Sequence, residues 1–184
     1  DWENRNHKLI EGELQYVCEL KYDGVAIGIQ YKDGKLFRAV TRGDGEQGED
    51  VTTNVKTIRS IPLQLSGDYP SDFEIRGEIF FPWVAFDKLN KEREEIGEAT
   101  FANPRNTASG TLKLQKSSLV ASRGLDCYLY GVYGADLSEA GHFEMVQKAE
   151  TWGFKVPQEN KRFIELTESV EGVMSFIDHW DQKR

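Results

Sequence analysis

The stretch CELKYDG, residues 18–24, alternates apolar and charged side chains and ends in a glycine. Successive side chains of a β-strand point to opposite faces, so a strand here would place Glu19, Lys21 and Asp23 on one face. One lysine beside two carboxylates could be a surface charge cluster. It could equally be a nucleophile with its supporting groups, and the rest of the sequence has to distinguish the two.

Composition sets the first limits on function. The chain has 184 residues, of which 39% are hydrophobic, so it can bury a core. A formal net charge of −8 opposes non-specific binding to nucleic acid, which needs a local excess of Lys and Arg. Cys18 and Cys127 lack a CxxC partner, which predicts free thiols and not a zinc site. No apolar run approaches 18 residues and no signal-peptide pattern is present, so we expect a soluble cytoplasmic protein without membrane contact.

Hydrophobic periodicity predicts an α+β protein with a mainly antiparallel sheet and surrounding helices. Asp33-Gly34 predicts a two-residue hairpin turn. Residues 1–12 look like the end of a preceding element. The expected strands cover residues 14–21, 25–31, 36–42, 73–81 and 125–132. The expected helices cover residues 50–59, 84–96, 103–114, 143–152 and 167–180.

Three further charged residues stand in glycine- or proline-marked segments and give Lys21 a chemical context. A carboxylate alone stabilises a protonated lysine, so a nucleophilic Lys21 needs a metal ion or nearby arginines. Arg42 in TRGDG and Arg105 in ANPRN suit contacts with phosphate or ribose oxygens. Glu78 in IRGE could share a hydrated Mg²⁺ with Asp23.

A simpler interpretation exists for each of these residues taken singly. Most charged side chains are surface residues, so any one of them could be a solvated strand charge. That interpretation weakens because the residues occur together with several glycine-bearing loops. Tyr128 and Tyr130 could line a nucleotide pocket or fill a core strand, and we favour the core, where strand aromatics usually pack.

The order of segments makes the assignment more specific. CELKYDG, AVTRGDGEQGEDVTTNVKTI, EIRGEIF, FANPRNTASGTL and YLYGVY follow one another with a spacing that resembles the adenylation domain of bacterial NAD-dependent DNA ligases. The resemblance runs from about Val17 to Gly134 and continues more loosely through WGFKVP at 152–157. It implies a nucleotidyltransferase fold of the ATP-grasp-like type and a role in DNA replication and repair.

The resemblance also implies a mechanism with NAD and Mg²⁺ as cofactors. Lys21 would attack the α-phosphate of NAD, release nicotinamide mononucleotide and become lysyl-AMP. The AMP would then pass to the 5′-phosphate of a nick in double-stranded DNA, and the 3′-hydroxyl would displace it. The implied cofactor-binding set is Glu19 for the adenine, Asp23 and Glu78 for Mg²⁺, Arg42 and Arg105 for the ribose and phosphate region, and Gly24 for close backbone approach.

Two basic residues are implied to contact DNA. Arg123, in VASRGL, stands where the family has a basic residue near the DNA backbone. Lys113, in TLKLQ, stands where many relatives have arginine. Lysine keeps the positive charge at that position but loses the bidentate fork, which makes Lys113 the weaker assignment.

By the same resemblance, residues 1–184 are expected to be part of an adenylation domain. The segment that binds nicotinamide mononucleotide, the C-terminal pocket strands and the oligonucleotide-binding, zinc, helix-hairpin-helix and BRCT regions are expected to lie outside them. We therefore expect a monomer that does not seal nicks alone. The alternatives are an ATP- or GTP-dependent nucleotidyltransferase, or a non-catalytic module that binds adenine nucleotide. TRGDG with FANPRNTASGTL favours the NAD-dependent class.

Overall fold

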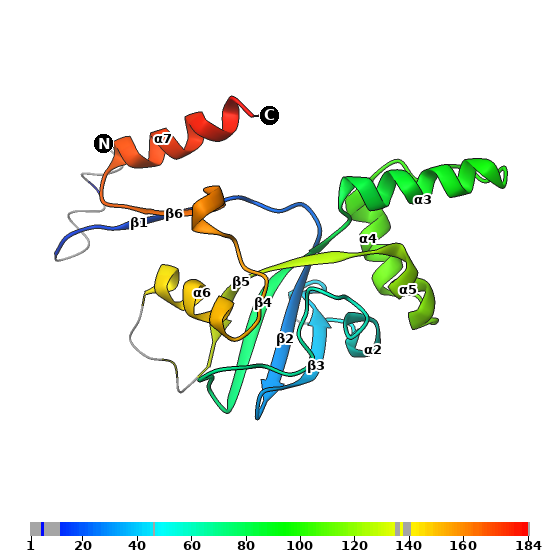
Figure 1. The fold of residues 1–184 in the computed structure, drawn as a ribbon, viewed down its shortest axis with the longest axis horizontal. Coiled ribbons are helices and arrows are strands. Elements are labelled where there is room, and N and C mark those ends of the chain that lie inside the picture. Colours follow the sequence, from blue (N-terminus) through cyan, green and yellow to red (C-terminus); the bar gives the residue numbers. More distant parts are fainter. Residues whose placement is uncertain (1–4, 6–11, 46, 135–136, 138–140, 184) are drawn as a thin grey trace. The chain divides into compact units, whose positions relative to one another are not determined.

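The computed structural model describes residues 5, 12–45, 47–134, 137 and 141–183 (Figure 1). The chain divides into two compact units. Unit 1 consists of Asp1–Lys21 and Pro157–Arg184, and unit 2 is the continuous segment Tyr22–Val156. The element predicted over residues 1–12 falls almost wholly outside the described residues.

Unit 1 is built on a two-stranded antiparallel sheet. Strand β1 (Tyr16–Glu19) pairs with β6 (Ile164–Thr167), and the short helix η1 (Glu159–Lys161) precedes β6. Helix α7 (Val170–Asp181) follows, and its N-cap hydroxyl, Ser169 Oγ, accepts a hydrogen bond from the backbone of Gly172 at 3.1 Å. The sequence did not predict β6, and α7 begins three residues after its predicted start.

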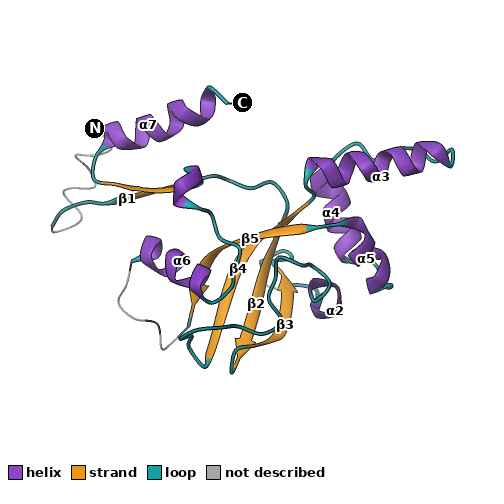
Figure 2. Cartoon of the chain, viewed as in Figure 1, coloured by secondary structure: helices purple, strands orange, loops and turns teal. Residues whose placement is uncertain are grey.

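Unit 2 contains a four-stranded antiparallel sheet in the order β3-β2-β4-β5 (Figure 2). Its strands are β2 (Val25–Lys32), β3 (Lys35–Thr41), β4 (Asp72–Phe80) and β5 (Asp126–Tyr133). The predicted hairpin turn is confirmed, because Asp33 and Gly34 both have positive φ, 47° and 71°. Alternate side chains bury one face of the sheet, with Ile29, Ile75 and Leu129 fully excluded from solvent.

The described residues of unit 2 form five helices. They are α2 (Thr52–Val55), α3 (Trp83–Glu95), α4 (Pro104–Leu112), α5 (Ser117–Arg123) and α6 (His142–Thr151). The predicted start of α4 is confirmed, since Asn103 caps it and proline follows. Helix α2 is only one turn long, α5 was not predicted, and the α+β class with antiparallel sheets is confirmed.

The predicted strand over residues 14–21 is too long, and the alternation argument built on it is wrong. Strand β1 ends at Glu19, and the last backbone hydrogen bond to the partner segment runs from Leu20 N to Phe163 O at 3.2 Å. Lys21 and Asp23 lie in the segment that leads from one unit into the other, where no strand pairs with them. Their common location therefore does not follow from strand periodicity.

Among the described residues, no helix has both the length and the apolar character needed to cross a membrane.

Candidate functional site

Three of the predicted motifs meet in one row across the sheet of unit 2. Ala26 on β2 lies opposite Glu78 on β4, and Glu78 lies opposite Tyr128 on β5. The backbone N–H of Arg42, just past β3, donates to the carbonyl oxygen of Ala26 at 3.2 Å. The TRGDG, IRGE and YLYG segments, distant in sequence, are therefore neighbours at this end of the sheet.

Glu78 is the polar centre of this row. Its Oε1 accepts a hydrogen bond from the backbone N–H of Gly24 at 3.2 Å. Its Oε2 lies 3.5 Å from the Tyr130 hydroxyl, which donates to it. Burial, reinforced by the charge of Glu78 and this hydrogen bond, raises the pKa of Tyr130 to about 12. Tyr130 therefore remains a neutral donor to the carboxylate across the physiological pH range.

Gly24 holds the backbone close to β4. A Cβ atom at this position would lie 2.1 Å from the carbonyl oxygen of Ile79, far inside van der Waals contact. The absence of a side chain is what allows the Gly24 N–H to reach Glu78. Close packing against β4 therefore explains why a glycine ends the stretch CELKYDG.

Asp23 connects the same segment to α4. Its Oδ1 lies 3.2 Å from Nη1 of Arg105, the second residue of that helix. The cap at Asn103 orients the start of α4, since its side chain accepts from the backbone N–H of Asn106 at 3.1 Å. Both side chains of the pair are mostly exposed, so the contact adds little stability, but it brings ANPRN next to KYDG.

An aromatic cluster lies beside this site. The ring of Tyr22 stacks on that of Tyr128 with centroids 4.5 Å apart, and Phe80 stacks on Tyr128 at 5.7 Å. The ammonium group of Lys155 lies 4.6 Å from the Tyr128 ring centroid and forms an ion pair with Asp126. Nothing in the sequence pattern assigned a role to Tyr22 or Lys155.

Tyr128 and Tyr130 do not occupy the core position that we favoured from the sequence. They alternate along β5 with Cys127 and Leu129, which are fully buried, so the two tyrosines lie on the opposite face and are only half-buried. The alternation was visible in the sequence. Which face would be covered depends on the pairing with β4, and the sequence did not reveal that pairing.

The loop that carries Arg42 is tightly folded. Gly43 and Gly45 have φ of +57° and +104°, which explains the glycine density of this segment. At Gly48, a Cβ atom would lie 1.8 Å from the carbonyl oxygen of Thr41. The Arg42 side chain itself is exposed at the beginning of the loop.

Glu19 and Lys21 belong to unit 1, so unit 2 contributes only part of the predicted site. Glu19 lies at the end of β1, opposite Ile164, and both Glu19 and Lys21 are exposed. Lys21 is the last residue of unit 1 and directly precedes Tyr22. Its approach to Glu78 or Asp23 remains a prediction.

The two predicted DNA contacts are both engaged within the protein. Lys113 forms an ion pair with Glu49. Arg123 Nη1 donates to the buried Thr111 hydroxyl at 2.7 Å. Burial, with a further contribution from Arg93, lowers the pKa of Arg123. The role of Lys113 and Arg123 in DNA binding remains a prediction.

The donor set for a metal ion is small. Within the part of the chain that the structure describes, no group of three or more His, Cys, Asp or Glu side chains could hold a metal ion. Asp23 and Glu78 provide two carboxylates, which fits a hydrated Mg²⁺ that also contacts a substrate phosphate and does not fit a cage made by protein alone.

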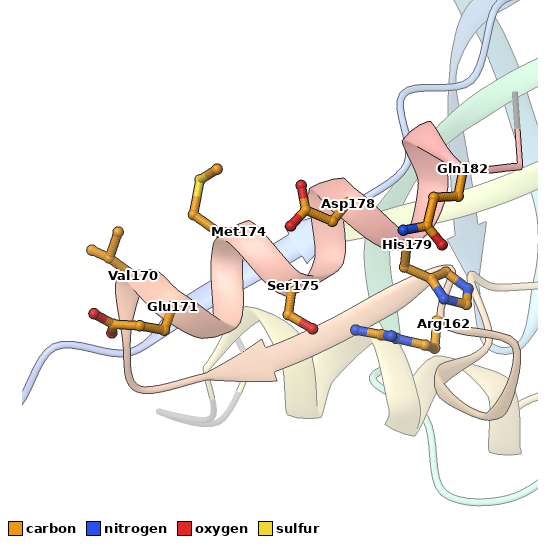
Figure 3. A pocket seen from close by; sticks show the side chains of 8 residues that line it. All are labelled: Arg162, Val170, Glu171, Met174, Ser175, Asp178, His179 and Gln182. Carbon is orange, nitrogen blue, oxygen red and sulfur yellow. The ribbon is translucent and has the colours of Figure 1, made fainter.

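A pocket of about 520 Å³ lies in unit 1 and is unrelated to the predicted residues. It is lined by Arg162 and by residues of α7 and its C-cap, and Figure 3 shows Ser175 and His179 on the side of the helix that faces Arg162. No residue of the predicted site lines this pocket, so it does not bear on the chemistry of Lys21.

Comparison with known proteins was consistent along the chain. The family model for the NAD-dependent DNA ligase adenylation domain matches residues 1–184. A DNA ligase of Christiangramia forsetii is 55% identical over 184 residues, and one of Bacteroides fragilis is 53% identical over 185. Each match covers 100% of this chain and 27% of the relative. A DNA ligase of Cytophaga hutchinsonii is 44% identical with the same coverage.

Proposed function

The chain belongs to the NAD-dependent DNA ligase adenylation domain family, and from this premise we propose that it transfers AMP from NAD to Lys21. It spans 27% of the length of its curated relatives. The overall nick-sealing reaction therefore belongs to the proposal as well, with nicked double-stranded DNA as the acceptor of the AMP. The match to the NAD-dependent family favours NAD over ATP or GTP as the donor.

One observation carries the proposal. The segments that the sequence marks as motifs converge where CELKYDG enters unit 2, with Gly24 bound to Glu78 and Asp23 bound to Arg105. Arg42 begins its loop in the same row of the sheet as Glu78. Surface charges without a common role have no reason to gather from separate loops around one chain segment.

The proposed step forms one bond and breaks one. The neutral amine of Lys21 attacks the α-phosphorus of NAD, and a phosphorus–nitrogen bond forms. The bond from that phosphorus to the bridging oxygen breaks, nicotinamide mononucleotide leaves with the oxygen, and the amine loses a proton. Arg42 and Arg105 neutralise phosphate charge during this step, as guanidinium groups do well.

We assign the other predicted site residues to the adenine, the metal ion and the DNA. Glu19 binds the adenine amino group, and Gly24 lets the nucleotide approach the backbone. Asp23 and Glu78 would hold a hydrated Mg²⁺ ion, which would supply positive charge at the phosphate. Lys113 and Arg123 face the DNA backbone in the later steps, where sequence-independent phosphate contacts determine affinity.

Intact mass after incubation with NAD and Mg²⁺ tests the proposal. A gain of one AMP that is absent with ATP and lost in Lys21→Ala would support it. Binding of NAD without covalent label would favour the non-catalytic module instead. The decisive comparison uses a chain that also contains the flanking regions of its relatives. If that longer chain also gains no AMP, the proposal is contradicted.

A further inference from the structure

The chain passes between the two units twice, after Lys21 and after Val156. In unit 2, a residue at each of these two connections contacts the same side chain, that of Tyr128. Tyr22, the first residue of unit 2, stacks its ring on Tyr128 at 4.5 Å with an interplanar angle of 20°. Lys155, the residue before Val156, places its ammonium group 4.6 Å from the centroid of the same ring.

At the first passage, three consecutive residues contact three elements of unit 2. The ring of Tyr22 stacks on Tyr128 of β5 at 4.5 Å and on Phe80 of β4 at 6.2 Å. Asp23 is held by Arg105 of α4 at 3.2 Å, and Gly24 by Glu78 of β4 at 3.2 Å. The nucleophile proposed above directly precedes this triply fixed segment.

At the second passage, Lys155 contacts β5, and its ammonium group also lies 6.0 Å from the ring centroid of Phe80 on β4. The carbonyl oxygen of Lys155 accepts from the backbone N–H of Leu129 at 2.9 Å. The Lys155 ammonium forms an ion pair with Asp126 and lies over the ring of Tyr128. An ammonium group that is paired and also lies over an aromatic face is more firmly located than an exposed lysine with one partner.

We propose that Tyr128 is a positioning residue, whose ring fixes both passages of the chain and thereby the place from which Lys21 acts. The contacts described are made by the ring, which Phe80 supports in a nearly parallel stack at 5.7 Å and 7°. Tyr128 touches no reacting atom in this proposal. It limits the freedom of Tyr22, and displacement of a reacting group by about 1 Å can cost on the order of a hundredfold in rate.

The structural half of this inference is tested by hydrogen exchange on the chain as it is. Tyr128→Leu should speed exchange at both passages together, at the amide of Gly24, whose N–H binds Glu78, and at that of Leu129, whose N–H binds Lys155. Tyr128→Phe keeps the ring, so its amides should exchange at the same rates as those of the unsubstituted chain. Tyr133→Leu is the matched control, because Tyr133 is also on β5 and stacks on a cation, Arg76 at 4.3 Å, but it lies opposite Glu74, near the other end of β4 from Glu78.

Faster exchange at only one passage, or equal effects of Tyr128→Leu and Tyr133→Leu, would overturn the shared anchor. This readout needs no enzymatic activity, so it holds even if the proposed AMP transfer fails. Unchanged exchange in Tyr128→Leu would overturn the anchor as well.

The positioning half rests on the proposed function and is tested by kinetics of label formation. Tyr128→Leu should lower the rate constant at saturating NAD by about tenfold or more, with little change in the concentration of NAD at half-maximal rate. Tyr128→Phe should restore the rate. A rise in that concentration with an unchanged rate constant would contradict positioning of Lys21. If the unsubstituted chain forms no AMP label at all, the result counts against the proposed function. The hydrogen-exchange experiment then tests on its own whether Tyr128 fixes both connections.

Discussion

The backbone N–H of Gly24 donates to Oε1 of Glu78 at 3.2 Å, although the two residues are 54 positions apart. This bond joins the segment that follows Lys21 to the central strand β4. The other oxygen of Glu78 is within reach of the Tyr130 hydroxyl at 3.5 Å. One carboxylate thus binds both the backbone that follows the proposed nucleophile and a hydroxyl group on β5.

Replacing Gly24 by alanine should destabilise unit 2. The new Cβ would lie 2.1 Å from the carbonyl oxygen of Ile79, and backbone atoms cannot yield as a flexible side chain does. We expect a loss of about 1–3 kcal/mol in the free energy of unfolding, measured by urea denaturation. Gly110→Ala is the control, because a Cβ there meets nothing within 4 Å and alanine suits a helix. Equal destabilisation by both would contradict the packing argument.

Glu78→Gln should change both chemistry and titration. The amide keeps the size of the side chain but removes its charge, so label formation at Lys21 should slow by tenfold or more, on the order of the loss of one electrostatic contact. The pKa of Tyr130 should fall from about 12 but stay above its ordinary value, because burial is the largest cause of the shift and remains. Tyrosinate absorbance during alkaline titration measures this, with Tyr130→Phe identifying the transition. An unaltered Tyr130 transition would disprove the coupling.

The pair of Asp23 and Arg105 should affect activity far more than stability. Both side chains are mostly exposed, so a double-mutant cycle with alanine should give a coupling in unfolding free energy below about 1 kcal/mol. Each single variant should nevertheless reduce label formation strongly, because each removes a group that we assign to Mg²⁺ or phosphate. Loss of stability in proportion to loss of activity would identify the pair as a structural bridge only.

The sequence predicted what depends on neighbouring residues. Asp33-Gly34 and Asn103-Pro104 act through local backbone preferences, and the structure confirms both. Strand β6 was missed because four residues carry little periodicity, and it forms by pairing with β1 far away in the chain. The strand alternation around Lys21 failed for a related reason. A strand continues only as far as its partner does, and the pairing of β1 ends with Glu19 and the hydrogen bond of Leu20, before Lys21.

The residues of the candidate site, too, were predictable from the sequence only in part. Motif spacing singled out Asp23, Glu78 and Arg105, two of which the structure joins to each other. It could not identify Tyr22 or Lys155, which are distant in sequence and both contact the ring of Tyr128. Contacts between distant segments depend on strand register, and register is not encoded in any one segment.

Alanine substitutions of Arg123 and Lys113 should differ in their effect on the stability of the protein and have similar effects on DNA binding. Arg123→Ala leaves the buried Thr111 hydroxyl without its donor and should cost about 1–3 kcal/mol in unfolding free energy. Lys113→Ala removes an exposed ion pair and should cost less than about 1 kcal/mol. In a ligase-length chain, each variant should reduce the salt dependence of DNA affinity by about one phosphate contact. Unchanged salt dependence would remove that residue from the DNA-binding set.

The two cysteines report separately on the two units. Cys18 is half-buried in β1 of unit 1, and Cys127 is buried in β5 of unit 2. Burial raises the pKa of both thiols, with Glu165 adding to the effect at Cys18 and Asp126 at Cys127. A raised pKa leaves less thiolate at neutral pH, so both should alkylate slowly in the folded protein and faster as the pH rises.

In increasing urea, Cys18 should become reactive before Cys127. Unit 1 rests on a two-stranded sheet, which gives marginal stability, whereas unit 2 has four strands and most of the buried core. Mass spectrometry of peptides after alkylation gives one midpoint for each thiol, and Cys18→Ala and Cys127→Ala verify the assignment. Coincident midpoints would contradict this order and show that the two units unfold as one cooperative structure.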